Sequence, residues 1–198
     1  MELDYRGFVF VISLAAVVNG MGIVRLLGAF AEYLRGRGRI TLVNYWVFDL
    51  WAAFQFLMHV LLWWSLWNMR HVEVFNFGIY LYVLTGPIIL YLGTSLLVPG
   101  VDEGRIDLRT HYFRVRPSYF TIYILLWLWG IFSWPVIKGG FAPTVSILVA
   151  NLGIAVILRV TDNPKVHSAL AIAAWGLLVF FVAGFGMQLG GVGELSTN

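Results

Sequence analysis

Five polar residues interrupt two long apolar runs near the start of this sequence. They are Asn19, Arg25, Asp49, Gln55 and His59. The two runs, residues 7–31 and 42–67, have the length and composition of helices that cross a lipid bilayer. Polar groups inside lipid are costly unless they find partners, so such residues mark either helix–helix contacts or a pathway for ions, protons or small solutes. These five residues form the candidate intramembrane polar site.

Spacing predicts which of these residues meet. Arg25 and Asp49 lie at similar distances from the basic stretch 35–39, about 10 Å into the membrane at about 1.5 Å per residue. We therefore expect an ion pair between them. Asn19 and Gln55 form a second depth-matched pair, further out. Asn19 and Arg25 are six residues apart on the first run, and Asp49 and Gln55 are six residues apart on the second. Six residues rotate a helix by about 240°, so the two pairs cannot both meet across one interface.

Gln55 and His59 are four residues apart and share one helix face. With Asn151 from a later apolar run they could line a polar seam. Two interpretations remain open. In the first, the residues are structural contacts that hold the bundle together. In the second, they line an ion, proton or small-solute site, in which a titrating His59 makes activity depend on pH.

Other chemistries find little support. The sequence has no Cys, which excludes disulfides, Cys-ligated zinc and iron–sulfur clusters. A bis-His haem needs two facing histidines, and the other three lie at or beyond the ends of the apolar runs: His71, His111 and His167. No Lys lies within an apolar run, which excludes a retinal Schiff base. We assign no catalytic residue, metal site or cofactor, and we leave enzymatic activity open while expecting none.

Composition indicates the fold class. The 198 residues are 60% hydrophobic and only 12% charged, about half the charge of a soluble domain. The sequence predicts an all-α, polytopic transmembrane helical bundle that forms a single domain over residues 1–198. Six spans are expected, at about 7–31, 42–67, 75–98, 119–137, 144–160 and 168–190.

Lys and Arg set the predicted orientation. Ten of the thirteen lie toward the side that holds loops 34–40 and 99–118, and three lie on the other. Cytoplasmic loops carry the excess of positive charge, so we expect these loops in the cytoplasm and both termini in the periplasm of a bacterial inner membrane. The net charge of +3 is explained by this topology, and no nucleic-acid partner is expected.

The hydrophilic stretch 99–118 mixes apolar and basic residues, as in a short element lying in the membrane interface. Its arginines are candidate ligands for anionic lipid headgroups: Arg105, Arg109, Arg114 and Arg116. The alternative is that these charges serve topology alone.

Three motifs carry a resemblance to known proteins. They are Gly22-xx-Arg25-Leu-Leu, Gln55 with Trp63-Trp64-Ser-Leu-Trp67, and Asp107-Leu-Arg109-xx-Tyr112-Phe113. In this order the chain resembles a group of small bacterial inner-membrane proteins known only as conserved hypothetical proteins, over roughly residues 15–120. The resemblance implies a six-span bacterial membrane protein. It supplies no activity, substrate or functional residue.

Two function classes follow. The first is a small homo-oligomeric channel or transporter-like protein for ions or protons, with the polar site near its pathway. The alternative is a non-catalytic subunit, scaffold or lipid-interacting sensor in a larger membrane complex, in which the same residues are structural. A water-filled path at the polar site would favour the first, and a dry, fully paired site with a broad apolar contact face would favour the second.

Overall fold

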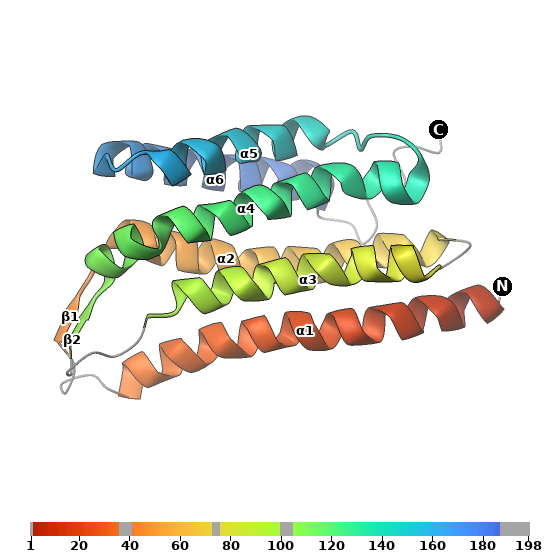
Figure 1. The fold of residues 1–198 in the computed structure, drawn as a ribbon, viewed down its shortest axis with the longest axis horizontal. Helices are drawn as coiled ribbons and strands as arrows, with labels where there is room; N and C mark the ends of the chain where they lie inside the picture. The colour runs from red at the N-terminus through yellow and green to blue at the C-terminus, as the bar shows by residue number, and fades with distance from the viewer. Residues whose placement is uncertain (1, 36–40, 73–75, 100–104, 187–198) are drawn as a thin grey trace.

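Six long helices dominate the computed structural model, which describes residues 2–35, 41–72, 76–99 and 105–186 (Figure 1). The helices are α1 (Glu2–Arg35), α2 (Trp46–Leu66), α3 (Phe77–Leu97), α4 (Leu108–Lys138), α5 (Val145–Val160) and α6 (Pro164–Phe181). Two short turns of other helix types follow α2 and α6, η1 (Trp67–His71) and η2 (Val182–Gly186). Two three-residue strands, β1 (Thr41–Val43) and β2 (Arg105–Asp107), complete the elements.

The helices lie side by side along one long axis (Figure 1). Helix α1 lies at one edge and packs on α3 and α2, α4 lies between α3 and α5, and α6 packs on α5 and α2. The larger hydrophobic core joins α2 to α6 around Trp51, whose ring meets Phe54, Phe120 and Tyr123 edge-on with centroids 5.1–5.8 Å away. A smaller core joins the first half of α1 to η1 and α3.

Five of these helices are long and apolar enough to cross a membrane, and α5 is a shorter apolar helix of 16 residues. Many large apolar side chains face outward, as expected where lipid rather than water surrounds the helices. The prediction of an all-helical bundle is therefore confirmed, with five helices long and apolar enough to cross a membrane.

Helix α4 is longer than the sequence predicted. It begins at Leu108, so most of the expected interfacial loop 99–118 is its first three turns. The Asp107 carboxylate caps the helix by accepting from the Thr110 amide at 2.9 Å. Pro117 lies inside the helix without ending it. Leu108, Tyr112 and Arg116, spaced by four residues, are all buried, and this buried face stabilises the extension.

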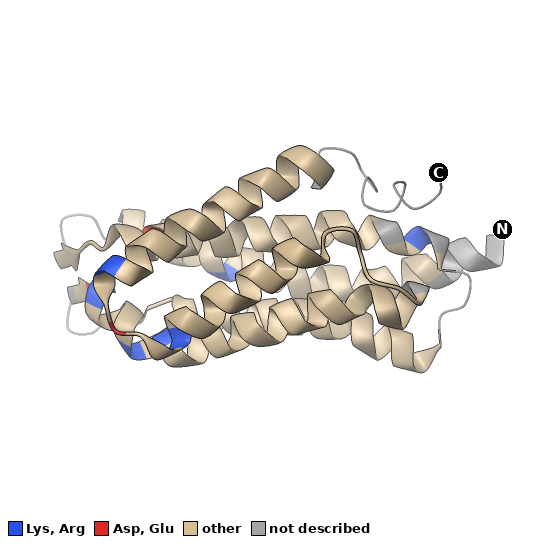
Figure 2. Ribbon diagram, turned by 90° about the horizontal axis from the view of Figure 1, so that it is seen from above, with Lys and Arg blue, Asp and Glu red and all other residues tan. Residues whose placement is uncertain are grey.

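A strand pair that the sequence did not predict joins two of the loops. β1 and β2 pair in parallel, with Leu42 opposite Ile106. The pair links the segment after α1 to the segment before α4, at the end of the bundle where most Lys and Arg gather (Figure 2). We call this the basic end and the other the opposite end. Successive helices run in opposite directions, so α1 begins and α6 ends at the opposite end (Figure 1).

Candidate functional site

The predicted ion pair between Arg25 and Asp49 is wrong. Both side chains are exposed, and no ion pair joins them within the described part of the chain. The reason lies in where α2 starts. Its first residue is Trp46 rather than residue 42, so Asp49 sits in the first helical turn instead of deep in the membrane. A carboxylate there is stabilised by the positive end of the helix dipole and does not need an arginine.

The other three predicted residues do come together. Asn19 of α1 and His59 of α2 are 2% and 0% exposed. The Asn19 carboxamide nitrogen donates to the His59 carbonyl oxygen at 3.0 Å, and the Asn19 Oδ1 lies 2.8 Å from His59 Nδ1. On its other side, His59 Nε2 lies 2.8 Å from Thr94 Oγ1 of α3. The predicted depth-matched partner of Asn19 was Gln55; the structure places His59 there instead.

Gln55 extends the same network to α4. Its amide nitrogen donates to the Leu90 carbonyl oxygen at 2.9 Å and to Thr94 Oγ1 at 3.1 Å. Its amide oxygen accepts from the hydroxyls of Tyr119 at 3.2 Å and Tyr123 at 2.8 Å. The side chains in this part of the network are all fully buried: Gln55, Thr94, Tyr119 and Tyr123. The network therefore runs without interruption from α1 through α2 and α3 to α4.

The contacts at Asn19 set the tautomer of His59. Because Asn19 donates through its nitrogen, its oxygen accepts, and His59 Nδ1 carries a proton. In the neutral imidazole, His59 Nε2 then accepts from the Thr94 hydroxyl, which itself accepts from Gln55. Each of these side chains has a hydrogen-bond partner within the protein. The arrangement is typical of a buried structural network, in which an unpaired member would be costly.

A glycine makes room for the network. A Cβ at Gly22 of α1 would lie 2.2 Å from His59 Cε1, whereas a Cβ at Gly93 of α3 would make ordinary contact with the Gln55 amide at 3.4 Å. The bare helix surface at Gly22 lets the imidazole lie directly against α1. Small residues at such points let helices in lipid approach closely.

Asn151, expected as a possible third member of a polar seam, is not part of this network. Its amide nitrogen donates to the Ile147 carbonyl oxygen of its own helix at 3.0 Å. It lines a separate cavity between α2, α4, α5 and α6. The seam predicted from Gln55, His59 and Asn151 is therefore wrong.

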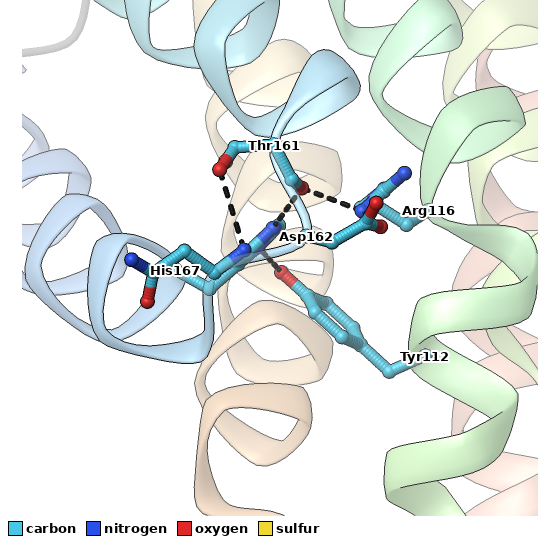
Figure 3. A network of polar contacts seen from close by, with 6 residues as sticks. Tyr112, Arg116, Thr161, Asp162 and His167 are labelled. Carbon is cyan, nitrogen blue, oxygen red and sulfur yellow. Dashed lines mark hydrogen bonds and ion pairs between the residues drawn. The ribbon is translucent and has the colours of Figure 1, made fainter.

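A second polar cluster, not foreseen from the sequence, lies at the basic end (Figure 3). The Tyr112 hydroxyl of α4 lies 2.7 Å from Nδ1 of the fully buried His167 of α6, whose Nε2 donates to the Thr161 carbonyl oxygen at 2.9 Å. Arg116 donates to the same carbonyl oxygen at 2.5 Å and pairs with Asp162. We call these five residues the α4–α6 clasp, because they tie the α5–α6 connection to the start of α4.

The clasp changes the set of candidate headgroup ligands. Arg109 and Arg114 are exposed at the basic end, as the prediction needs. Arg116 is 8% exposed and already paired, so it is not free to bind a lipid phosphate. Arg105 lies in β2.

No group of three or more His, Asp or Glu that could hold a metal ion occurs among the described residues. Comparisons with protein-family models, curated proteins and solved structures find no match for this chain. The resemblance to small bacterial inner-membrane proteins therefore stays a prediction, and the site has to be interpreted from its own geometry.

Sequence reasoning missed Thr94, Tyr119 and Tyr123, which complete the network. One signal was present. Tyr119 and Tyr123 are four residues apart, so their hydroxyls share a helix face, as Gln55 and His59 do. Nothing in the sequence indicated that these two faces meet, because that depends on how α2 and α4 are rotated in the bundle.

Proposed function

We propose that this chain is a non-catalytic scaffold subunit of a membrane assembly, rather than an ion or proton pathway. The observation that supports this most is the closed state of the polar network. Gln55, His59 and Thr94 are each 0% exposed, and each is hydrogen-bonded to other protein groups. They line neither the cavity near Asn151 nor a second cavity near Asp49, between α1, α2 and the β1–β2 pair. A conduction path needs side chains that can exchange partners with water or an ion.

The outward face of α1 supports a scaffold role. This helix has 34 residues, about 51 Å at about 1.5 Å per residue, against a hydrocarbon core of about 30 Å. Large apolar side chains along it are exposed, including Phe10 at 72% and Phe30 at 59%. We place the contact with another membrane protein on this face, because α1 lies at the edge of the bundle (Figure 1).

We further propose six spans with both termini in the periplasm of a bacterial inner membrane. Helix α5 spans about 24 Å, slightly less than the hydrocarbon core, and a bilayer adapts to such a mismatch at modest cost. The basic end then faces the cytoplasm, where the exposed Arg109 and Arg114 lie near anionic headgroups.

Flux through proteoliposomes tests the scaffold against the pathway. With pH-sensitive and potential-sensitive dyes, we expect wild type to match empty vesicles throughout the range from about pH 5 to pH 8 in which a His titrates. Flux above empty vesicles that is lost in Gln55→Leu would overturn the proposal and restore the pathway.

Photo-crosslinking in native membranes tests the contact face. A photoreactive amino acid at Phe10 or Phe30 should give a discrete adduct with another protein. The same group at Val179 of α6, which is also exposed, is the matched control. Lipid adducts alone at all three positions would contradict a partner on α1.

A further inference from the structure

A partly enclosed cavity of about 220 Å³ lies on the side of the bundle away from α1. Its walls come from the middle and end of α2 with η1, the second half of α4, the α4–α5 connection, the first half of α5 and the end of α6, with Leu90 from α3. Because successive helices alternate in direction, most of these segments lie toward the opposite end. The cavity therefore extends from the middle of the bundle, at Phe54 and Leu90, toward the opposite end, away from the basic loops.

The lining is chemically uniform. No Asp, Glu, Lys, Arg or His is among the residues that line the cavity, and most are Leu, Ile, Met, Phe or Trp. Three of the four Ser, Thr and Asn side chains in the lining hydrogen-bond to their own helices, and the fourth is Thr144. Ser65 donates to the Leu62 carbonyl oxygen at 2.8 Å, and Ser133 donates to that of Gly130 at 2.7 Å. With Asn151 bonded in the same way, the wall offers an occupant almost only apolar contacts.

An apolar occupant has physical reason to enter. Water gains few hydrogen bonds in such a space, and an empty cavity leaves its lining without contact atoms. The helices around the cavity face lipid, since Phe132 and Val149 are exposed by 50% and 52%. Trp64 lines the cavity and is 39% exposed, and an indole there suits the membrane interface.

We propose that this cavity binds one acyl chain of a membrane phospholipid, whose headgroup stays at the surface of the opposite end. Lipid tails are the apolar chains at highest concentration beside the cavity, and a flexible chain can adapt its shape to a space between helices. Since no charged residue lines the wall, binding selects the acyl chain and not the headgroup. This site is distinct from Arg109 and Arg114, and the proposal does not depend on the scaffold role.

Filling the cavity from α4 tests the proposal. A Cβ at Gly130 would meet only the Leu148 side chain, at 3.7 and 4.0 Å, so Gly130→Leu projects into the cavity. Gly153→Leu on α5 is the matched control, because Gly153 is exposed and a Cβ there meets nothing within 4 Å. Leu177→Trp on α6, with the exposed Val179→Trp as its control, fills the same space from another wall.

The measurement is native mass spectrometry after reconstitution with palmitoyl-oleoyl phosphatidylglycerol or phosphatidylethanolamine. We expect wild type and both controls to retain one more phospholipid per chain than both filling variants, equally for the two headgroups. Equal retention by wild type and by whichever filling variant keeps its fold on size exclusion would overturn the proposal. Retention of free oleic acid in place of phospholipid, or dependence on the anionic headgroup, would also overturn it.

Discussion

At the scale of single residues, the polar network depends on the missing side chain of Gly22 as well as on its hydrogen bonds. The imidazole of His59 lies against the bare backbone of Gly22 while both of its nitrogens are engaged, by Asn19 and Thr94. A ring fixed at both ends cannot swing away from a new methyl group. The network is therefore sensitive to volume as well as to hydrogen bonding.

Gly22→Ala should destabilise the protein by about 1–3 kcal/mol, because the new Cβ would lie 2.2 Å from His59 Cε1 and the ring cannot move without losing a hydrogen bond. Gly20→Ala is the control, since a Cβ there meets nothing within 4 Å, and it should be neutral or stabilising by up to about 1 kcal/mol. Unfolding by denaturant in detergent micelles measures both. Equal effects of the two substitutions would contradict the close contact.

A double-mutant cycle of Asn19→Leu and His59→Leu should give a coupling of about 0.6–1.7 kcal/mol, the range for hydrogen bonds between membrane helices. The same cycle on Arg25→Leu and Asp49→Leu should give a coupling near zero, because these two side chains are exposed and unpaired with each other. The reverse ranking of the two cycles would support the ion pair that the sequence predicted.

At the scale of elements, the α4–α6 clasp explains how a short hairpin is held in the bundle. The connection between α5 and α6 is only three residues long, Thr161 to Asn163, and Asn163 caps α6 by accepting from the Lys165 amide at 3.0 Å. Tyr112 and Arg116 reach this connection from the first turns of α4. The part of α4 that precedes the predicted span thus positions the last two helices.

Tyr112→Phe should loosen this connection. It removes the hydroxyl that donates to His167 Nδ1 and leaves a buried acceptor unpaired, at a cost of about 1–3 kcal/mol. Hydrogen exchange should accelerate in the first turn of α6 and at Thr161. Tyr91→Phe is the matched control, because no hydrogen bond of the Tyr91 hydroxyl occurs among the described residues, and it should leave exchange unchanged. Equal exchange rates in both variants would show that the hydroxyl is not part of the clasp.

At the scale of the whole molecule, the distribution of charge gives the bundle two unlike ends (Figure 2). Strands β1 and β2 pair at the basic end, and α4 carries Arg109, Arg114 and Arg116 directly after β2. The acyl-chain cavity lies toward the other end. In the proposed orientation, the basic end and the cavity therefore lie toward opposite faces of the bilayer.

Cysteine labelling tests the orientation, and the chain is suited to it because it has no native Cys. In intact cells, Thr197→Cys should react with a membrane-impermeant maleimide. Gly38→Cys should react only after the cytoplasmic membrane is permeabilised. The opposite pattern would invert the proposed topology without affecting the fold.

Composition and the lengths of the apolar runs were enough to predict an all-helical bundle suited to a membrane. Long apolar runs with little charge require backbone hydrogen bonds to be satisfied locally, and helices do this in lipid whatever their neighbours are. The sequence also singled out Asn19, Gln55 and His59, whose side chains are buried and hydrogen-bonded in the structure. These conclusions depend on composition and on local spacing alone.

The partners of these side chains depend on how the helices pack against one another. A helix boundary four residues later than expected moved Asp49 from the membrane interior to a first turn, and the rotation of α1 and α4 set His59 against Asn19 and Gln55 against two tyrosines. Each helix can turn about its own axis with little change in local energy. The rotation is chosen by close packing between helices, which includes contacts far apart in the chain and leaves no trace in the spacing along any single helix.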